Sequence, residues 1–187
     1  MSKILRSIIL LGSLTSLCFG QEKTMQHAIL IGKTFPTIAA ETLAGNKMSY
    51  PDSIMGKTTL ISIAFVREAQ SQIDSWANPF ETRFQGREDI RYYEIPMLSG
   101  KWKLMSFFID GGMRSGIPKG KHNNVSTYYG DLRPYLTALN IQDTDLAYLF
   151  LLDDQGKIQW HDQGFASEEK LQQLYHTCEK LISLDKN

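Results

Sequence analysis

The stretch that most constrains the fold is residues 59–66, TLISIAFV, which carries no charge and is rich in β-branched and aromatic side chains. Such a run is typical of a strand covered on both faces, because a half-exposed strand would alternate polar and apolar residues. A strand of this kind needs other layers on either side of it. The sequence therefore predicts an α/β domain with this strand in the middle of its sheet.

A helical pattern follows the central strand. Its apolar residues recur every three or four positions and so share one helix face: Ile73, Trp76, Phe80 and Phe84. We expect Trp76 to lie in the core on this face. Pro79 follows Asn78, a good helix cap, so we expect it to break or restart the helix there.

The remaining segments complete a recognisable order of elements. We predict a hairpin within residues 21–57, a strand at 90–98, a helix at 102–113 ending at Gly111-Gly112, a loop at 114–130, a short helix at 132–140, a β-hairpin turning at 154–156, and a last helix capped by Ser167. A βαβ half followed by a ββα half is the thioredoxin-like arrangement. The predicted fold is a thioredoxin-like domain, a central mixed sheet flanked by helices, with an N-terminal hairpin extension.

Domains of this fold normally carry a Cys-x-x-Cys pair in the turn after the central strand, and here residues 68–72 are EAQSQ. A proline is also expected just before the strand at 147–152, where its cis peptide would face the thiols. Leu146, Ala147 and Tyr148 stand there instead. Thiol–disulfide chemistry needs a reactive thiolate and usually a second thiol. The sequence therefore predicts a redox-inactive domain and no catalytic residue.

Cys178 is the one cysteine of residues 21–187. It falls in the apolar stripe of the last helix, with Leu174 and Leu181, and we expect a buried structural cysteine. The absence of a reactive thiol pair favours a non-catalytic module that binds a partner protein. Two alternatives to this interpretation stay open. One is a thiol-dependent enzyme, such as a one-cysteine peroxidase, that uses Cys178. The other is a structural domain with no dedicated partner.

No metal, nucleotide or other cofactor is predicted. His122, His161 and His176 lack the spacing of metal ligands. Residues 51–58, PDSIMGKT, resemble a phosphate-binding loop, but Pro51 replaces its first glycine and the segment runs into a strand rather than a helix.

Residues 1–20 have the features of a secretory signal peptide: two basic residues, then an apolar stretch at 8–19 that is too short for a permanent membrane anchor. Small residues favour cleavage after Gly20. The alternative is a lipoprotein modified at Cys18, which the bulky Leu17 disfavours. We expect an exported protein, periplasmic or secreted.

The predicted mature domain, residues 21–187, keeps 18 basic and 20 acidic side chains, a net charge near −2. This charge provides no electrostatic footprint for nucleic acid or for an anionic membrane surface. Cleavage would also remove Cys18 and leave a single cysteine, so no internal disulfide is expected.

A candidate recognition surface lies where the catalytic site of the fold would be. The end of strand 59–66 and the loop before strand 147–152 should be adjacent, at the edge where α/β sheets present their sites. Polar contacts and aromatic anchors there would bind a partner protein, and the candidate residues are Arg67, Gln70, Gln72, Tyr128, Asp145 and Tyr148. The alternative is that these are solvated loop residues.

Three segments, at 75–80, 93–104 and 136–174, resemble the thioredoxin-like assembly factors of the mitochondrial ATP synthase, the family named for ATPase complex subunit ten. The resemblance covers roughly residues 32–182. The positions that fit its pattern are Ser75, Trp76, Pro79, Phe80, Asn140, Tyr148, Leu152, Asp153, Gly156, Trp160, Gly164, Ala166 and Glu169.

The chain departs from this pattern at two positions. Gln159 replaces the usual arginine before the tryptophan, and Ala147 replaces a glycine. The resemblance implies a protein that binds partner polypeptides, including those of a membrane complex, during assembly and does no thiol chemistry. The bacterial-type signal peptide would make this chain a distant exported relative, so the resemblance does not identify its client.

Overall fold

The computed structural model describes residues 29–184; the predicted signal peptide, its cleavage site and Cys18 lie outside the described residues. The chain divides into two compact units between Ile31 and Gly32, and the account below concerns the second unit.

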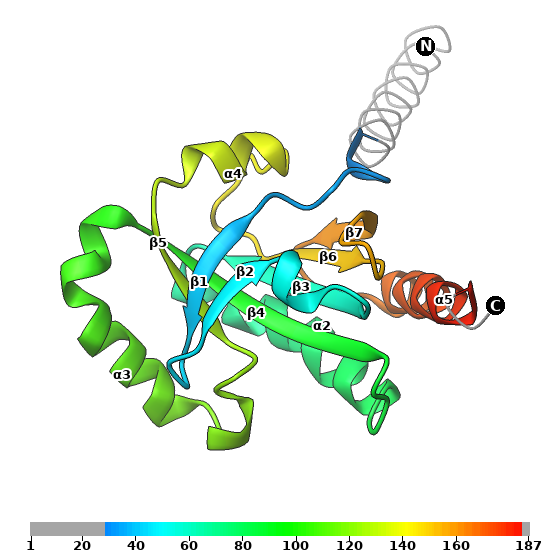
Figure 1. Cartoon of the computed structure of the whole chain (residues 1–187), viewed down its shortest axis with the longest axis horizontal. Helices are drawn as coiled ribbons and strands as arrows, with labels where there is room; N and C mark the ends of the chain where they lie inside the picture. Colours follow the sequence, from blue (N-terminus) through cyan, green and yellow to red (C-terminus); the bar gives the residue numbers. More distant parts are fainter. Residues whose placement is uncertain (1–28, 185–187) are drawn as a thin grey trace, which may run out of the picture. The chain divides into compact units, whose positions relative to one another are not determined.

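A seven-stranded mixed sheet forms the centre of this unit, in the order β2-β1-β5-β4-β3-β6-β7 (Figure 1). The strands are β1 (Ile38–Thr42), β2 (Lys47–Tyr50), β3 (Thr58–Ala64), β4 (Ile90–Ser99), β5 (Ser126–Gly130), β6 (Tyr148–Leu152) and β7 (Ile158–Gln163). β3 pairs in parallel with β4 and antiparallel with β6, and all of its residues are buried. The prediction of a doubly covered strand inside the sheet is confirmed.

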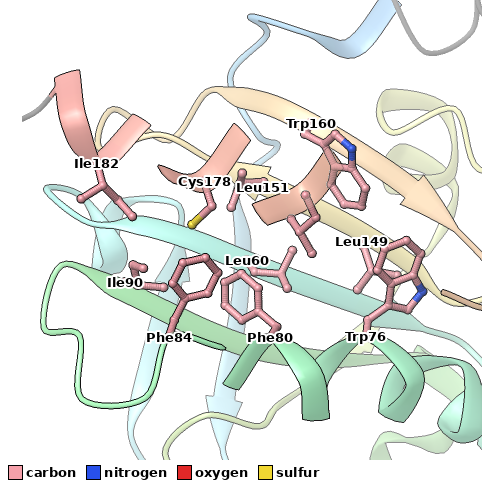
Figure 2. Packing of buried hydrophobic residues seen from close by; sticks show 11 residues of the cluster. Leu60, Trp76, Phe80, Phe84, Ile90, Leu149, Leu151, Trp160, Cys178 and Ile182 are labelled. Carbon is pink, nitrogen blue, oxygen red and sulfur yellow. The ribbon is translucent and has the colours of Figure 1, made fainter. Parts of the chain in front are cut away.

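The helices are α2 (Gln70–Arg83), α3 (Ser106–Gly116), α4 (Arg133–Ala138) and α5 (Glu168–Leu184), and short 3-10 turns are η1 (Asp52–Ile54), η2 (Arg67–Ala69), η3 (Gly100–Met105) and η4 (Lys119–Lys121). α2 and α5 bury their apolar stripes against one face of β3 and β6. Leu60 of β3, Leu149 of β6 and Trp76 of α2 all belong to this layer, and Leu149 lies beside Trp76 (Figure 2). On the other face, the ring of Phe150 packs edge-on against Phe35, which precedes β1.

Several predicted boundaries are confirmed. β1 and β2 form the N-terminal hairpin, and β6 and β7 form the second hairpin, whose turn places Gly156 at φ +73°. Ser167 caps α5, since its hydroxyl accepts a hydrogen bond from the Lys170 N–H. Trp76 is fully buried, as predicted.

Three predictions around the helices are wrong. α2 continues through Pro79, because its buried face holds both halves of the helix on the sheet. α3 begins later than predicted, at Ser106 after η3, and passes through Gly111-Gly112 to Gly116, since contacts beyond the glycines hold its second half. The predicted loop at 114–130 contains β5, which pairs with β4 and β1. Those partners are distant in sequence, so a local pattern could not reveal them.

Candidate partner-binding site

The predicted meeting of β3 and the loop before β6 is present. β3, β4 and β5 run in parallel, so their carboxyl ends lie at one edge of the sheet. β6 is antiparallel to β3, and Tyr148 at its beginning pairs with Ile63 near the end of β3. The start of α2 therefore lies beside the segment that precedes β6.

Gln72 joins these two segments. Its Oε1 accepts a hydrogen bond of 2.9 Å from the Ala147 N–H, and its Nε2 donates one of 3.2 Å to the Asp145 carbonyl. The Leu146–Ala147 peptide is trans, unlike the proline peptide expected of a redox-active relative. The side chain of Gln72 thus fixes the loop before β6 against the first turn of α2, and its polar atoms are already engaged within the chain.

Tyr148 was predicted to be an aromatic anchor for a partner, and this prediction is wrong. Its side chain is buried in the sheet, and its hydroxyl donates to the Asp143 carbonyl at 2.9 Å and accepts from the Asp143 N–H at 3.2 Å. Burial raises the pKa of Tyr148. The residue is the first of a strand whose members are all buried, so its ring belongs to the core and its hydroxyl positions the loop.

Arg67, Gln70 and Asp145 are exposed, as the candidate surface requires. The Gln70 amide donates to Asp74 Oδ1 at 3.0 Å. Tyr128 lies apart from them on β5, which β4 separates from β3, so at the usual spacing it is about 10 Å away across the sheet. The structure therefore brings together the candidates of β3, α2 and the β6 loop, and leaves Tyr128 outside the group.

Glu94 lies behind this surface and was not predicted as a site residue. It stands on β4 opposite Ser62 and is buried. Burial raises the pKa of Glu94 to about 7; a hydrogen bond from Gln70 opposes this shift, and the nearby Asp74 carboxylate adds to it. A single glutamate inside the apolar run YYEIPML is the sequence signal that could have identified it.

The positions of the family pattern after β3 form one hydrogen-bonded joint. The Ser75 hydroxyl donates to the Gln72 carbonyl at 2.6 Å and accepts from the Ala166 N–H at 3.0 Å. The Trp76 Nε1–H donates to the Gly164 carbonyl at 2.7 Å. These bonds attach α2 to the connection between β7 and α5.

The pattern residues of the second hairpin hold its turn. Asp153 Oδ1 accepts from the Gln155 and Lys157 N–H groups, and its Oδ2 accepts from Gln159 Nε2 at 2.7 Å. The glutamine that replaces the family's arginine therefore still bonds to this aspartate. A Cβ at Gly156 would come within 2.6 Å of the Pro51 side chain, so the turn requires glycine.

The other pattern positions are core or backbone features. Phe80 and Trp160 are buried, and the Trp160 ring packs edge-on against Trp76. Asn140 has a positive φ of 52° after α4, and Glu169 lies exposed in the first turn of α5. The pattern thus describes the joints and turns of this fold.

Comparison with known protein families shows which family this chain belongs to, because the model of the family described as ATP10 protein matches residues 31–181. The chain belongs to the ATP10 family. The resemblance to the ATP synthase assembly factors is therefore confirmed. No curated protein matches the ATP10-family chain.

Solved structures similar to this ATP10-family protein share its fold at low identity. A candidate protein disulfide isomerase from Bacteroides thetaiotaomicron has a TM-score of 0.57 and 15% identity, with 82% of this chain and 90% of that chain covered. BsSco, of the Sco family of cytochrome c oxidase assembly proteins, has a TM-score of 0.54 and 10% identity, with 79% and 95% covered. The exposed lipoprotein thioredoxin Etrx1 of Streptococcus pneumoniae has a TM-score of 0.51 and 12% identity, with 78% of this chain and 100% of that chain covered. The predicted thioredoxin-like fold is confirmed.

Cys178 of this ATP10-family protein is fully buried, as predicted. Figure 2 shows it among Phe84, Leu151 and Ile182. Burial raises the pKa of the Cys178 thiol to about 12. A thiol in this position is protonated and out of reach of a substrate while the domain is folded.

A hollow of about 620 Å³ lies between α2 and β4 of the ATP10-family domain, and sequence reasoning did not anticipate it. Lys121 and Glu81 form a 2.6 Å ion pair there, and Phe80 and Tyr92 contribute apolar surface. Within residues 29–184, no three histidine, cysteine or carboxylate side chains gather in the manner of a metal site.

Proposed function

We propose that this protein is a non-catalytic assembly factor that binds a partner polypeptide outside the cytoplasm, at the surface formed by the start of α2 and the loop before β6. ATP10 is a family of assembly factors, which implies protein partners in general. The observation that supports this site is the Gln72 bridge, which holds both segments in one arrangement at the sheet edge. A surface fixed before binding loses less conformational freedom when a partner docks.

The chemistry of the site favours binding over catalysis. The turn after β3, residues 68–72, contains no cysteine, and its Glu68 and Gln70 side chains are exposed. Arg67 and Asp145 add one charge of each sign to the same edge. These groups suit a polar rim around a partner contact. Buried Cys178 does not provide the reactive thiolate that the peroxidase alternative needs.

The partner could belong to a membrane complex, and the proposed location outside the cytoplasm depends on the predicted signal peptide. None of the helices described between residues 29 and 184 is long and apolar enough to cross a bilayer. We propose that the domain meets its client from the aqueous side of a membrane.

Site-directed photocrosslinking in cells tests this proposal. A photoreactive residue at position 70 should capture a specific protein, while the same residue at exposed position Lys180 on α5 serves as the control. Equal or absent capture at position 70 would contradict the proposed surface. Peroxide turnover or insulin reduction by the purified protein, abolished by Cys178→Ser, would favour the enzyme alternative instead.

A further inference from the structure

η3 and α3 expose an unusual amount of apolar surface. A helix of a soluble domain normally buries one apolar stripe, yet no residue of η3 or α3 is buried. The exposed fraction is 94% for Leu104, 78% for Phe107 and 69% for Phe108, and Trp102 and Met105 are also exposed. We call these five residues the 102–108 patch. Single exposed apolar residues are ordinary, whereas five within seven positions mark an interaction surface.

The second half of α3 attaches the helix to the domain through polar contacts. The Tyr129 hydroxyl donates to Asp110 Oδ1 at 2.8 Å, and Arg114 Nε donates to the Leu43 carbonyl at 2.8 Å. The 102–108 patch lies before these contacts, and Figure 1 shows α3 at the margin of the domain, on the side away from α5. The second half of α3 is thus hydrogen-bonded to the domain, while the side chains of the patch are exposed to solvent.

The same segment concentrates positive charge. Residues 100–121 contain five basic side chains and one acidic side chain, Asp110. Lys101 and Lys103 alternate with Trp102 and Leu104, and the Lys101 ammonium lies 5.7 Å above the Trp102 ring. In the described part of the chain neither lysine forms a salt bridge. The apolar residues of the patch are therefore interleaved with two lysines, Lys101 and Lys103, whose charges no carboxylate of the described chain pairs.

This combination favours a lipid surface over a second copy of the chain. A two-fold dimer through the patch would bring the lysines of both copies together. An anionic bilayer instead accepts both components, since apolar side chains enter the boundary between headgroups and acyl chains while lysines reach the phosphates. The net charge near −2 of the predicted mature domain suggested no site for an anionic membrane surface, because that sum averages out the local excess of basic residues at 100–121. We propose that η3 and the start of α3 dock the protein on an anionic membrane surface. This proposal is independent of the partner site at β3.

Tryptophan fluorescence provides a local test. Trp76 and Trp160 are buried, so Trp102 is the exposed tryptophan of the chain. The full chain is mixed with phosphatidylglycerol and phosphatidylcholine vesicles whose acyl chains carry bromine. We expect quenching of the Trp102 emission, and we expect this quenching to disappear in Trp102→Phe. The readout reports the patch even if another part of the chain binds lipid.

Two variants separate the apolar and charged contributions. The triple variant Leu104→Ser, Phe107→Ser, Phe108→Ser keeps Trp102 and should lose the quenching. Lys101→Gln with Lys103→Gln should weaken binding to anionic vesicles roughly twenty-five-fold, because each basic side chain near such a surface contributes a factor of about five. Phe165→Ser removes an exposed phenylalanine elsewhere and should change nothing. Circular dichroism checks that all variants are folded.

Several results would overturn the proposal. Quenching that persists in the triple serine variant would show that the apolar residues of the patch do not bind the lipid. Equal quenching with phosphatidylcholine alone would show that binding does not depend on the negative charge of the membrane. Lipid-free association that buries Trp102 would assign the patch to a second copy. Capture of a protein at the patch without quenching by vesicles would assign it to a polypeptide partner.

Discussion

At the scale of single residues, Glu94 links stability to pH. Its folded-state pKa of about 7 lies above the ordinary value of 4.5, because burial disfavours the charged form. The folded protein therefore binds the proton more tightly than the unfolded chain does. Stability is greatest below pH 4.5 as far as this group is concerned, and it decreases as the pH rises through 7. Gln70, Asp74, Glu81 and Lys121 are the groups that modify this pKa.

Glu94→Gln should abolish this dependence. We expect the variant to gain up to roughly 3 kcal/mol over the wild type at pH 8, and the gain to vanish towards pH 4.5. Urea unfolding at a series of pH values measures it. Glu68→Gln is the matched control, because it makes the same substitution at an exposed position. A constant difference between wild type and Glu94→Gln at all pH values would show that the residue does not titrate as inferred.

At the scale of elements, the sequence could predict those whose signal is local. β3 has an uncharged run, the second hairpin has a glycine turn, and α5 has a cap and an apolar stripe. β5 has none of these: it pairs with β4 and β1, and only their presence makes STYYG a strand. The adjacency of β3 and the loop before β6 was predictable from topology, whereas the roles of Gln72 and Tyr148 depend on a loop geometry that spacing cannot reveal.

Gln72→Ala should loosen the joint between α2 and the loop before β6. The variant leaves the N–H of buried Ala147 without its partner, which costs about 1–3 kcal/mol. Denaturant unfolding measures the loss, and hydrogen exchange should show faster exchange at Ala147. Gln173→Ala, at an exposed position on α5, should change stability by less than about 0.5 kcal/mol. Equal effects of the two substitutions would mean that the bridge contributes nothing.

At the scale of the whole molecule, the reactivity of Cys178 should report global unfolding. The thiol lies in the core formed by α2, α5 and the sheet, so a disulfide reagent reaches it only when that core opens. With Cys18 replaced by serine, so that Cys178 is the one thiol of the full chain, we expect native labelling to be slow and to accelerate with urea in proportion to the unfolded fraction. Rapid labelling without denaturant would contradict the buried position and revive the thiol-dependent alternative.

The predicted export also concerns the whole chain. Mass spectrometry of the protein isolated from its native cells should find a mature N-terminus at or within a few residues of Gln21. A lipid adduct on Cys18 would support the lipoprotein alternative instead, and an intact Met1 would contradict both.

The order of strands has a consequence for biosynthesis. Thr59 of β3 lies opposite Leu152 of β6, and the same core is closed by Ile182 near the end of α5. A growing or translocating chain that has released only β3, α2 and β4 still lacks the strand and the helix that cover them. Its apolar surfaces stay open until β6 and α5 have emerged. Folding of this core therefore waits for α5, and until then this chain has the same need for protection as the clients of an assembly factor.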